Sequence, residues 1–365
     1  MNRTETGQGP FLRQAWYAAA SSDEVGAGLL ARTLLNEPVL LYRLESGEPV
    51  ALLDRCAHRF APLSLGRRCG DEVVCPYHGM RYGPDGVCTQ VPGQATVPAR
   101  ARVHRYPTLE RYGLVFVWMG DPARADARHL VSIAQYGQAG WGLSRGHALF
   151  HACLDNILDN LIDPAHTTYV HPRTIGSDAG ADVAVQAELE GADTLVCGRW
   201  VNDAPAVPMV QRFAPPDGPV DRWQFYRVRL PCTSWVDFGS LPAGSPHTPE
   251  AMDAAPYRVI SYAFLTPQDA EHTHYFSFQL RNFAADDGAV TAEFNALYRA
   301  TFDEDRVLLE AIQREERRAP GTAPTRIASD AGVARLRRMA HAWREAEQPH
   351  ATAAAPHQRT PDLGG

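Results

Sequence analysis

Short apolar runs separated by glycine and proline fill the first third of the chain. Runs of this kind, either continuous or alternating with polar residues, are typical of strands whose turns carry Gly and Pro. No helical period interrupts them, so residues 1–125 are predicted to form an all-β domain. The clearest predicted strands are Pro38–Arg43, Val50–Asp54, Glu72–Pro76 and Leu114–Trp118.

The pattern changes after Gly120-Asp121-Pro122. A first predicted helix has an apolar stripe with spacings of three and four: Leu154, Ile157, Leu158, Leu161 and Ile162. A second helix is expected over Asp303–Arg318, and strands are expected at Thr194–Val201, Trp223–Leu230, Tyr257–Thr266 and Thr273–Phe283. Residues 126–347 are therefore predicted to form an α+β domain, and the aperiodic residues 348–365 a disordered tail.

Composition narrows the possible functions. The chain has 365 residues and a formal net charge of -7, so nucleic acid is not an expected partner. It contains no lysine, and all 35 basic residues are arginines, which excludes a Walker lysine and Schiff-base chemistry. The longest apolar stretch, Leu114–Met119, is too short to cross a bilayer, and no apolar leader opens the chain, so no membrane partner is expected and the cytoplasm is the expected compartment. The seven cysteines are therefore expected to be thiols or metal ligands rather than disulfides.

Two thiols and two imidazoles occur in matched short pairs. One residue separates Cys56 from His58, two separate Cys75 from His78, and 16 residues lie between the pairs. Thiolate suits iron bonded to sulfide, and imidazole brings less negative charge, so two of each predict an asymmetric Rieske [2Fe-2S] cluster. The alternative is a zinc site, which more commonly pairs Cys with Cys and His with His. The mixed order therefore favours the iron–sulfur cluster.

Further candidate ligands follow the first predicted helix, whose polar side carries Asp155, Asp159, Asn160 and Asp163. His166 and His171 are five residues apart, which on a continuous helix turns them about 140 degrees from each other. Both can face one metal only if the helix ends between them. β-branched residues between the two histidines and the proline after His171 predict such a break.

A third ligand is expected from the second predicted helix. Asp305 shares a predicted helix face with the apolar residues Leu308, Leu309 and Ile312. An unpaired carboxylate on a buried apolar face is costly, whereas a bound cation compensates it, so Asp305 is favoured over Asp303 and Glu304. Two histidines and one carboxylate form the facial triad of non-haem Fe(II) oxygenases.

The chain from Phe11 to about Ile312 resembles the oxygenase components of Rieske non-haem iron oxygenases, in particular the branch of vanillate O-demethylase and dicamba monooxygenase. Neither Ala61 nor Tyr77 is a cysteine, where respiratory Rieske proteins carry a disulfide, so an oxygenase is favoured over a quinol oxidase subunit. The resemblance is carried by the two cluster loops, Asn160–His171, Glu304–Ile312 and Thr266–Phe276.

The resemblance implies a Rieske domain followed by a catalytic domain with an antiparallel sheet flanked by helices, a helix-grip-like arrangement. It implies that His166, His171 and Asp305 hold a mononuclear Fe(II), that Asn160 lies close to this iron, and that Asp163 connects it to the cluster of a neighbouring subunit. A head-to-tail homotrimer is implied as well. The chain lacks a glycine-rich dinucleotide fingerprint, so a separate NAD(P)H-dependent reductase of the flavin or ferredoxin type is expected.

The implied activity is the insertion of one oxygen atom from O2 into a small aromatic substrate, by O- or N-dealkylation or hydroxylation. Two alternatives are a ring-hydroxylating dioxygenase that forms a cis-dihydrodiol, and an electron carrier with a degenerate catalytic half. Candidate pocket walls are the aromatic residues Trp223, Phe225, Trp235 and Phe238. Four arginines have the chemistry to hold a carboxylate substrate, and the sequence selects none of them: Arg199, Arg212, Arg227 and Arg229.

Overall fold

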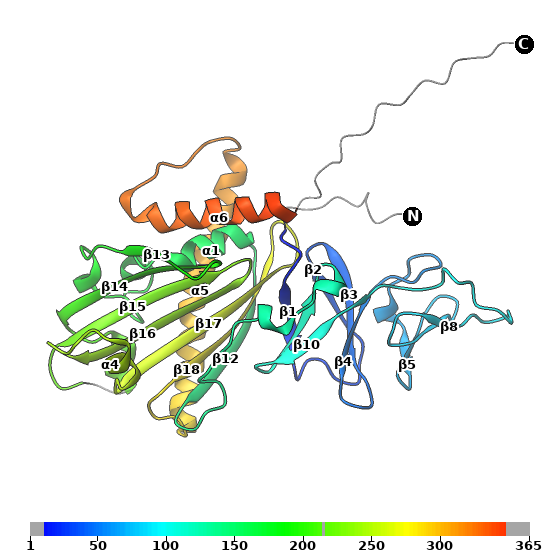
Figure 1. The fold of residues 1–365 in the computed structure, drawn as a ribbon, viewed down its shortest axis with the longest axis horizontal. Coiled ribbons are helices and arrows are strands. Elements are labelled where there is room, and N and C mark those ends of the chain that lie inside the picture. The colour runs from blue at the N-terminus through cyan, green and yellow to red at the C-terminus, as the bar shows by residue number, and fades with distance from the viewer. Residues whose placement is uncertain (1–10, 214–215, 348–365) are drawn as a thin grey trace, which may run out of the picture.

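The computed structural model describes residues 11–213 and 216–347. Three small antiparallel sheets form the N-terminal part, and one seven-stranded antiparallel sheet with helices forms the C-terminal part (Figure 1). This arrangement confirms the predicted fold class, an all-β domain followed by an α+β domain. The predicted disordered tail at residues 348–365 lies outside the described residues.

The N-terminal sheets contain the four strands predicted there, as β3, β4, β6 and β11. The first sheet has the order β1 (Trp16–Ser21), β11 (Leu114–Trp118) and β10 (Thr108–Arg111). The second has the order β2 (Leu30–Leu34), β3 (Glu37–Arg43), β4 (Pro49–Leu53) and β9 (Arg105–Tyr106). The third has the order β5 (Arg67–Cys69), β6 (Glu72–Val74), β7 (Arg81–Tyr82) and β8 (Cys88–Gln90).

The large sheet contains the four strands predicted for the second half, as β14, β15, β17 and β18, together with three that were not predicted. Its order is β12 (Gly142–Phe150), β18 (Thr273–Arg281), β17 (Tyr257–Pro267), β16 (Thr233–Pro242), β15 (Val220–Arg229), β14 (Thr194–Ala204) and β13 (Gln186–Glu190). The missed strand β12 contains Gly142, Gly146 and Arg145, which obscure its alternation. Its nine residues all pair with β18, so tertiary pairing rather than local pattern defines it.

The helices are α1 (Leu154–Ile162), α2 (Thr167–Val170), α3 (Pro208–Phe213), α4 (Pro249–Asp253), α5 (Gly288–Arg318) and α6 (Ala331–Glu347). The first predicted helix is α1. The second predicted helix is the C-terminal half of α5, which begins at Gly288 because the side chain of Asp287 accepts hydrogen bonds from the N–H groups of Ala289 and Val290. No helix in the two described ranges is both long enough and apolar enough to cross a membrane.

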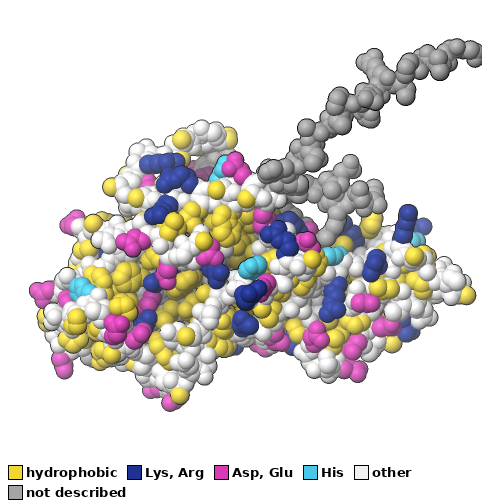
Figure 2. Space-filling view, in the orientation of Figure 1, with side chains coloured by type: hydrophobic (Ala, Val, Ile, Leu, Met, Phe, Trp, Pro, Cys, Tyr) yellow, Lys and Arg dark blue, Asp and Glu magenta, His cyan; other side chains and the backbone are white. Residues whose placement is uncertain are grey.

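The two faces of the large sheet have different partners. On one face, aromatic residues of β17 and β18 pack against β1 and β11, as where the rings of Phe264 and Phe116 lie 5.2 Å apart. On the other face lie α1 and α5, and α5 passes behind the strands in Figure 1. The side of the sheet turned toward the viewer carries hydrophobic residues among arginines and carboxylates (Figure 2). Successive side chains along each strand therefore alternate between the two faces of the sheet. One face packs against the N-terminal domain, and the other, called the inner face below, is covered by α1 and α5.

Candidate metal centres and substrate cavity

The two predicted cluster loops share one backbone pattern. In each loop the cysteine N–H donates to the carbonyl of the residue five positions on, at 2.9 Å for Cys56 and 2.8 Å for Cys75. Each loop also turns through a positive φ at the fourth residue after the cysteine, 61° at Phe60 and 71° at Gly79. The loops therefore present their two cysteines in matching conformations.

The four candidate ligands of these loops differ in burial. Both thiols are buried, and the Sγ of Cys56 lies 3.2 Å from the Tyr82 hydroxyl. The His58 and His78 rings are exposed, with their Nδ1 atoms 3.2 Å apart. Burial raises the pKa of the Cys75 thiol, because the buried thiolate is poorly solvated. The positive charge of bound ferric iron would compensate this cost of ionising the thiol. Two buried sulfur donors and two exposed imidazoles fit the asymmetric ligand set of a Rieske cluster.

The candidate triad is built around a chain break at the end of α1. Pro164 disfavours helical backbone at Asp163, which is extended at φ -103° and ψ 102°. The first predicted helix therefore ends before both histidines, earlier than expected. The expected break between the histidines is also present, because α2 (Thr167–Val170) ends before His171, whose φ of -120° and ψ of 44° are not helical. His166 and His171 stand at the two ends of the single helical turn α2.

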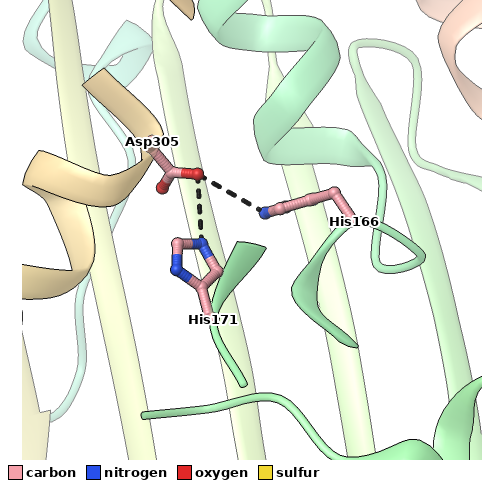
Figure 3. A group of neighbouring side chains, drawn as sticks. All are labelled: His166, His171 and Asp305. Atoms are coloured by element: carbon pink, nitrogen blue, oxygen red, sulfur yellow. Dashed lines mark ion pairs between the residues drawn. The ribbon is translucent and has the colours of Figure 1, made fainter. Parts of the chain in front are cut away.

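The three predicted iron ligands converge. The Nε2 atom of His171 lies 3.0 Å from Oδ1 of Asp305, and that of His166 lies 3.7 Å from the same oxygen. One donor atom from each residue lies within 4.8 Å of the others (Figure 3). Figure 3 shows the Asp305 carboxylate reaching from its helix toward both rings. Two imidazole nitrogens and one carboxylate oxygen that face a common point match the donor set for non-haem Fe(II).

Neighbouring groups fix the orientation of each triad member. Asn160 donates from Nδ2 to Oδ1 of Asp305 at 3.1 Å. The Nδ1 atom of His171 lies 2.8 Å from Oε2 of Glu304, a residue that was considered above only as a less favoured iron ligand. Burial lowers the pKa of His166. Burial also acts to lower that of His171, but the hydrogen bonds to Asp305 and Glu304 outweigh it and leave the pKa raised.

Asp163 contacts His166 through its backbone rather than through its side chain. The Nδ1 atom of His166 contacts the backbone carbonyl of Asp163, whereas the Asp163 carboxylate accepts the N–H of Ala165 at 2.8 Å. The tight turn at Pro164 brings the carbonyl rather than the side chain to the ring. Arg199, buried behind this turn, donates to the Pro164 carbonyl at 3.2 Å and so holds the turn in place.

The buried face of α5 differs in part from the predicted one. Asp305 and Leu309 are buried as expected, but Leu308 and Ile312 are 43% and 39% exposed. The actual buried stripe is Phe294, Tyr298, Thr301, Asp305, Leu309 and Gln313. It includes polar residues because the helix also lines a cavity.

A cavity lies between the triad and the inner face of the large sheet, reached by His166, His171 and Asp305. Of the four aromatic residues predicted as walls, Phe238 lines this cavity. Trp223, Phe225 and Trp235 do not, because alternation along their strands places them on the other face of the sheet. The remaining wall mixes hydroxyl or amide groups with apolar ones: Gln224, Tyr226, Ser234, Ser261, Tyr275, Tyr298, Thr301, Val236, Ala263 and Phe302. Such a lining suits a small, largely apolar ligand with a few polar groups.

Comparison with known proteins identifies the family. Residues 15–107 match the Rieske [2Fe-2S] domain, and residues 150–346 match the vanillate O-demethylase oxygenase C-terminal domain. The chain belongs to the Rieske non-haem iron oxygenases. This oxygenase is 38% identical over 328 residues to the toluene-4-sulfonate monooxygenase system iron-sulfur subunit of Comamonas testosteroni, covering 88% of this chain and 94% of that one.

Two further relatives extend the likeness over the full length. The oxygenase is 32% identical over 354 residues to the vanillate O-demethylase oxygenase subunit of a Pseudomonas species, covering 94% and 98% of the two chains. It superimposes with a TM-score of 0.79 on the crystal structure of dicamba monooxygenase with non-heme iron and dicamba, at 28% identity and with 93% and 98% of the chains covered.

These relatives confirm the expected reaction type. The oxygenase is the oxygenase component of a multicomponent monooxygenase, which carries a Rieske [2Fe-2S] cluster and a mononuclear iron and receives electrons from a separate reductase. The monooxygenase interpretation is therefore favoured over the cis-dihydrodiol-forming dioxygenase, and the chain is an enzyme rather than an electron carrier.

Proposed function

We propose that Cys56, His58, Cys75 and His78 hold the Rieske cluster and that His166, His171 and Asp305 hold the Fe(II) at which a small aromatic substrate is oxidised. The observation that carries this proposal is the triad itself, whose donor atoms lie within 4.8 Å of one another at the wall of a cavity. The ferrous ion supplies dioxygen activation when it is bound, and the cluster supplies electrons.

The protein side chains position the substrate and keep water away from it. Phe238, Val236 and Phe302 offer apolar surface for an aromatic ring, and nearby hydroxyl groups offer hydrogen bonds. The relatives described above are named for toluene-4-sulfonate and vanillate, both single-ring aromatic compounds. The proposed reaction is hydroxylation or O- or N-dealkylation of such a compound.

The proposed assembly is a head-to-tail homotrimer, in which each cluster serves the iron of the next subunit. In Figure 1 the third sheet, which adjoins the cluster loops, lies at the right end of the molecule, whereas α5 lies behind the large sheet in the left half, so transfer within one chain would be long. Phe60 and Tyr77, exposed by 67% and 58%, belong to the two cluster loops. Tyr169, between the two histidines in sequence, and Leu308, three residues after Asp305, are exposed by 77% and 43%. Two different apolar surfaces, one beside each centre, suit a heterologous contact that closes into a ring.

Within this contact Asp163 is the proposed connection between His166 and the neighbouring cluster, and Asn160 the residue that positions Asp305. The support for Asp163 is its backbone contact with the His166 ring and a carboxylate that stays only half buried. The proposed electron donor is an NAD(P)H-dependent reductase of the flavin or ferredoxin type. The proposed location is the cytoplasm, in keeping with seven cysteines of which none forms a disulfide in the described part of the chain.

The reaction is tested with the iron-loaded oxygenase, a generic reductase, NADH and 4-toluenesulfonate under 18O2. Hydroxylation of the methyl group is expected to place one labelled atom in the alcohol product. Two labelled atoms on adjacent ring carbons contradict a monooxygenase. NADH consumption without product does not count as turnover.

The ligand assignment is tested by metal analysis. His166→Ala is expected to lose the mononuclear iron and keep the two cluster irons with their low-g paramagnetic signal. His58→Ala is expected to lose the cluster signal instead. Loss of the cluster signal in His166→Ala would contradict the assignment of two separate centres.

A further inference from the structure

Arg222 on β15 is a buried cation with no anionic partner within residues 11–213 and 216–347. Its side chain is 4% exposed, and neither Nε nor Nη1 has a hydrogen-bond partner among the described residues. Among the described residues, the charged group that affects the pKa of Arg222 is Arg199, which is itself a cation. Burying an unpaired charge is strongly unfavourable, so a bound anion beside Arg222 would stabilise the protein.

Other buried arginines of the protein do have partners. Arg258 lies 2.7 Å from Oδ2 of Asp237. Arg281 also has unpaired nitrogens, but its Nη2 donates to the Thr291 hydroxyl at 2.6 Å and to the Ala284 carbonyl at 2.9 Å, so it holds the start of α5. Arg222 therefore stands apart from the structural arginines.

Arg222 lies on the same face of the sheet as the residues that line the substrate cavity. Arg222, Gln224 and Tyr226 alternate onto the inner face of β15, and Arg222 pairs in register with Ser240 of β16. A small cavity lined by Arg222 and Ser240 shares two wall residues, Gln224 and Phe238, with the triad cavity. The Ser240 hydroxyl also has no partner within the described residues. Two unsatisfied polar side chains thus lie side by side in a small cavity that adjoins the substrate cavity.

The positions along β15 give the substrate an orientation. Tyr226 lies near the triad, since its hydroxyl interacts with Thr167, the residue after His166. Arg222 lies four residues away, roughly 13 Å along the strand. An anion at Arg222 therefore belongs to the end of the substrate remote from the iron.

We propose that Arg222, together with Ser240, forms an anion subsite and that the preferred substrates are aromatic compounds with a carboxylate or sulfonate opposite the oxidised group. This inference rests on the proposed function, because it assigns a substrate class to the same cavity. Guanidinium binds either anion through two parallel hydrogen bonds, and the low-polarity surroundings strengthen them. Burial lowers the pKa of Arg222 to about 10, which leaves it cationic at neutral pH.

The test measures binding to the iron-loaded oxygenase by anaerobic calorimetry. The probes are 4-toluenesulfonate, 4-methylbenzoate and the uncharged methyl 4-tolyl sulfone, and the two anions compared show which head group the subsite prefers. Arg222→Gln is expected to raise Kd for the preferred anion by about 10- to 100-fold, because it removes a charge-assisted hydrogen-bonding group. Binding of the sulfone is expected to change by less than about threefold, and Arg222→Lys is expected to restore part of the anion affinity.

The matched control is Arg227→Gln, which removes the same charge from the outer face of the same strand, where Arg227 pairs with Glu190 at 2.7 Å. It is expected to leave anion binding unchanged. Ligand-free Arg222→Gln is expected to melt at or above the wild-type temperature, because it loses an unpaired buried charge. A lower melting temperature with unchanged anion affinity would make Arg222 a structural residue and overturn the proposal.

Two other results also overturn it: equal loss of sulfone and anion binding in Arg222→Gln, or equal affinity of the wild type for the sulfone and both anions. The proposed function fails separately. Charge-selective loss in Arg222→Gln without oxidation of any probe by the wild type supports the subsite and contradicts the proposed reaction. Oxidation of an anion whose affinity does not depend on Arg222 contradicts the subsite alone.

Discussion

Nδ1 of His171 lies 2.8 Å from Oε2 of Glu304, while Nε2 of the same ring faces Asp305 at 3.0 Å. Consecutive residues of α5 therefore hold both sides of one buried imidazole. The contact to Glu304 favours the tautomer with hydrogen on Nδ1 and leaves Nε2 free to bind a metal. Carboxylate–histidine–metal arrangements of this kind orient the ligand and raise its basicity.

Replacing Glu304 with Ala is expected to weaken iron binding by about 10- to 100-fold, because the His171 ring loses its orienting acceptor. Competition with a ferrous chelator measures the affinity, and the paramagnetic signal of the cluster is expected to stay unchanged. Glu315→Ala is the control, since Glu315 lies exposed on the same helix and pairs with Arg318. Unchanged iron affinity in Glu304→Ala would show that His171 is held by its other contacts.

Changing Asn160 to Asp is expected to place a second carboxylate where an amide now donates to Asp305 at 3.1 Å. Two adjacent carboxylates repel each other unless a cation or proton lies between them. The iron-free variant is therefore expected to be less stable than the wild type, by on the order of 1–3 kcal/mol. Thermal unfolding with and without Fe(II) tests this, and the stabilisation by Fe(II) is expected to be larger in the variant. An iron-free melting temperature equal to that of the wild type would contradict the contact.

Local spacing was enough to predict some parts of the site. The loops of Cys56 and Cys75 each contain their two proposed cluster ligands within four residues, so the short motif was enough to predict the kind of cluster. Asp305 lies far from both histidines in sequence, yet a carboxylate on a helix face with buried residues was a sufficient signal. The same argument wrongly predicted that Leu308 is buried, whereas it is 43% exposed. The cavity, rather than a continuous apolar stripe, determines which face of α5 is buried.

Other parts depend on tertiary contacts that no local pattern contains. Arg222 stands out because two of its buried nitrogens have no partner among the described residues, and Glu304 because it contacts the ring of His171. Neither fact can be read from the neighbouring sequence. Helix α6 was not predicted, because two of its three buried residues, Gly332 and Ala340, are too small to form a clear apolar pattern around Leu336. Small residues at these positions let α6 lie close to its neighbours, which only the folded chain reveals.

Asp163→Asn is expected to slow electron delivery to the iron while leaving both metal centres occupied. The change keeps the backbone carbonyl that contacts His166 but removes the negative charge proposed to connect the subunits. A loss of about 10- to 100-fold in coupled turnover is expected. Single-turnover oxidation of the reduced cluster, followed optically, measures the step directly. Asp178→Asn, at an exposed position, is the control. Equal cluster oxidation rates in Asp163→Asn and wild type would exclude a connecting role for Asp163.

The ion pairs between α6 and α1 are expected to stabilise the site from behind. Arg337 donates to Asp159 at 2.9 and 2.6 Å and to Asp155 at 2.8 Å, and Asp159 immediately precedes Asn160. Arg337→Met is expected to lower the free energy of unfolding by about 1–3 kcal/mol at pH 8, because the half-buried carboxylate of Asp159 is left without its cation. Thermal unfolding of the iron-loaded protein measures the loss, with Arg338→Met, at an exposed position of the same helix, as the control.

The loss in Arg337→Met is expected to shrink as the pH falls. Burial raises the pKa of Asp159 above its usual 3.8 even with Arg337 opposing the shift, and removal of Arg337 raises it further. An acid whose pKa is higher in the folded state favours folding when protonated, so the destabilisation grows as the pH rises through the folded-state pKa and is complete above it. The difference in melting temperature between Arg337→Met and wild type is therefore expected to be smaller at pH 5 than at pH 8. A difference that is independent of pH would show that Arg337 stabilises α6 by packing rather than by its charge.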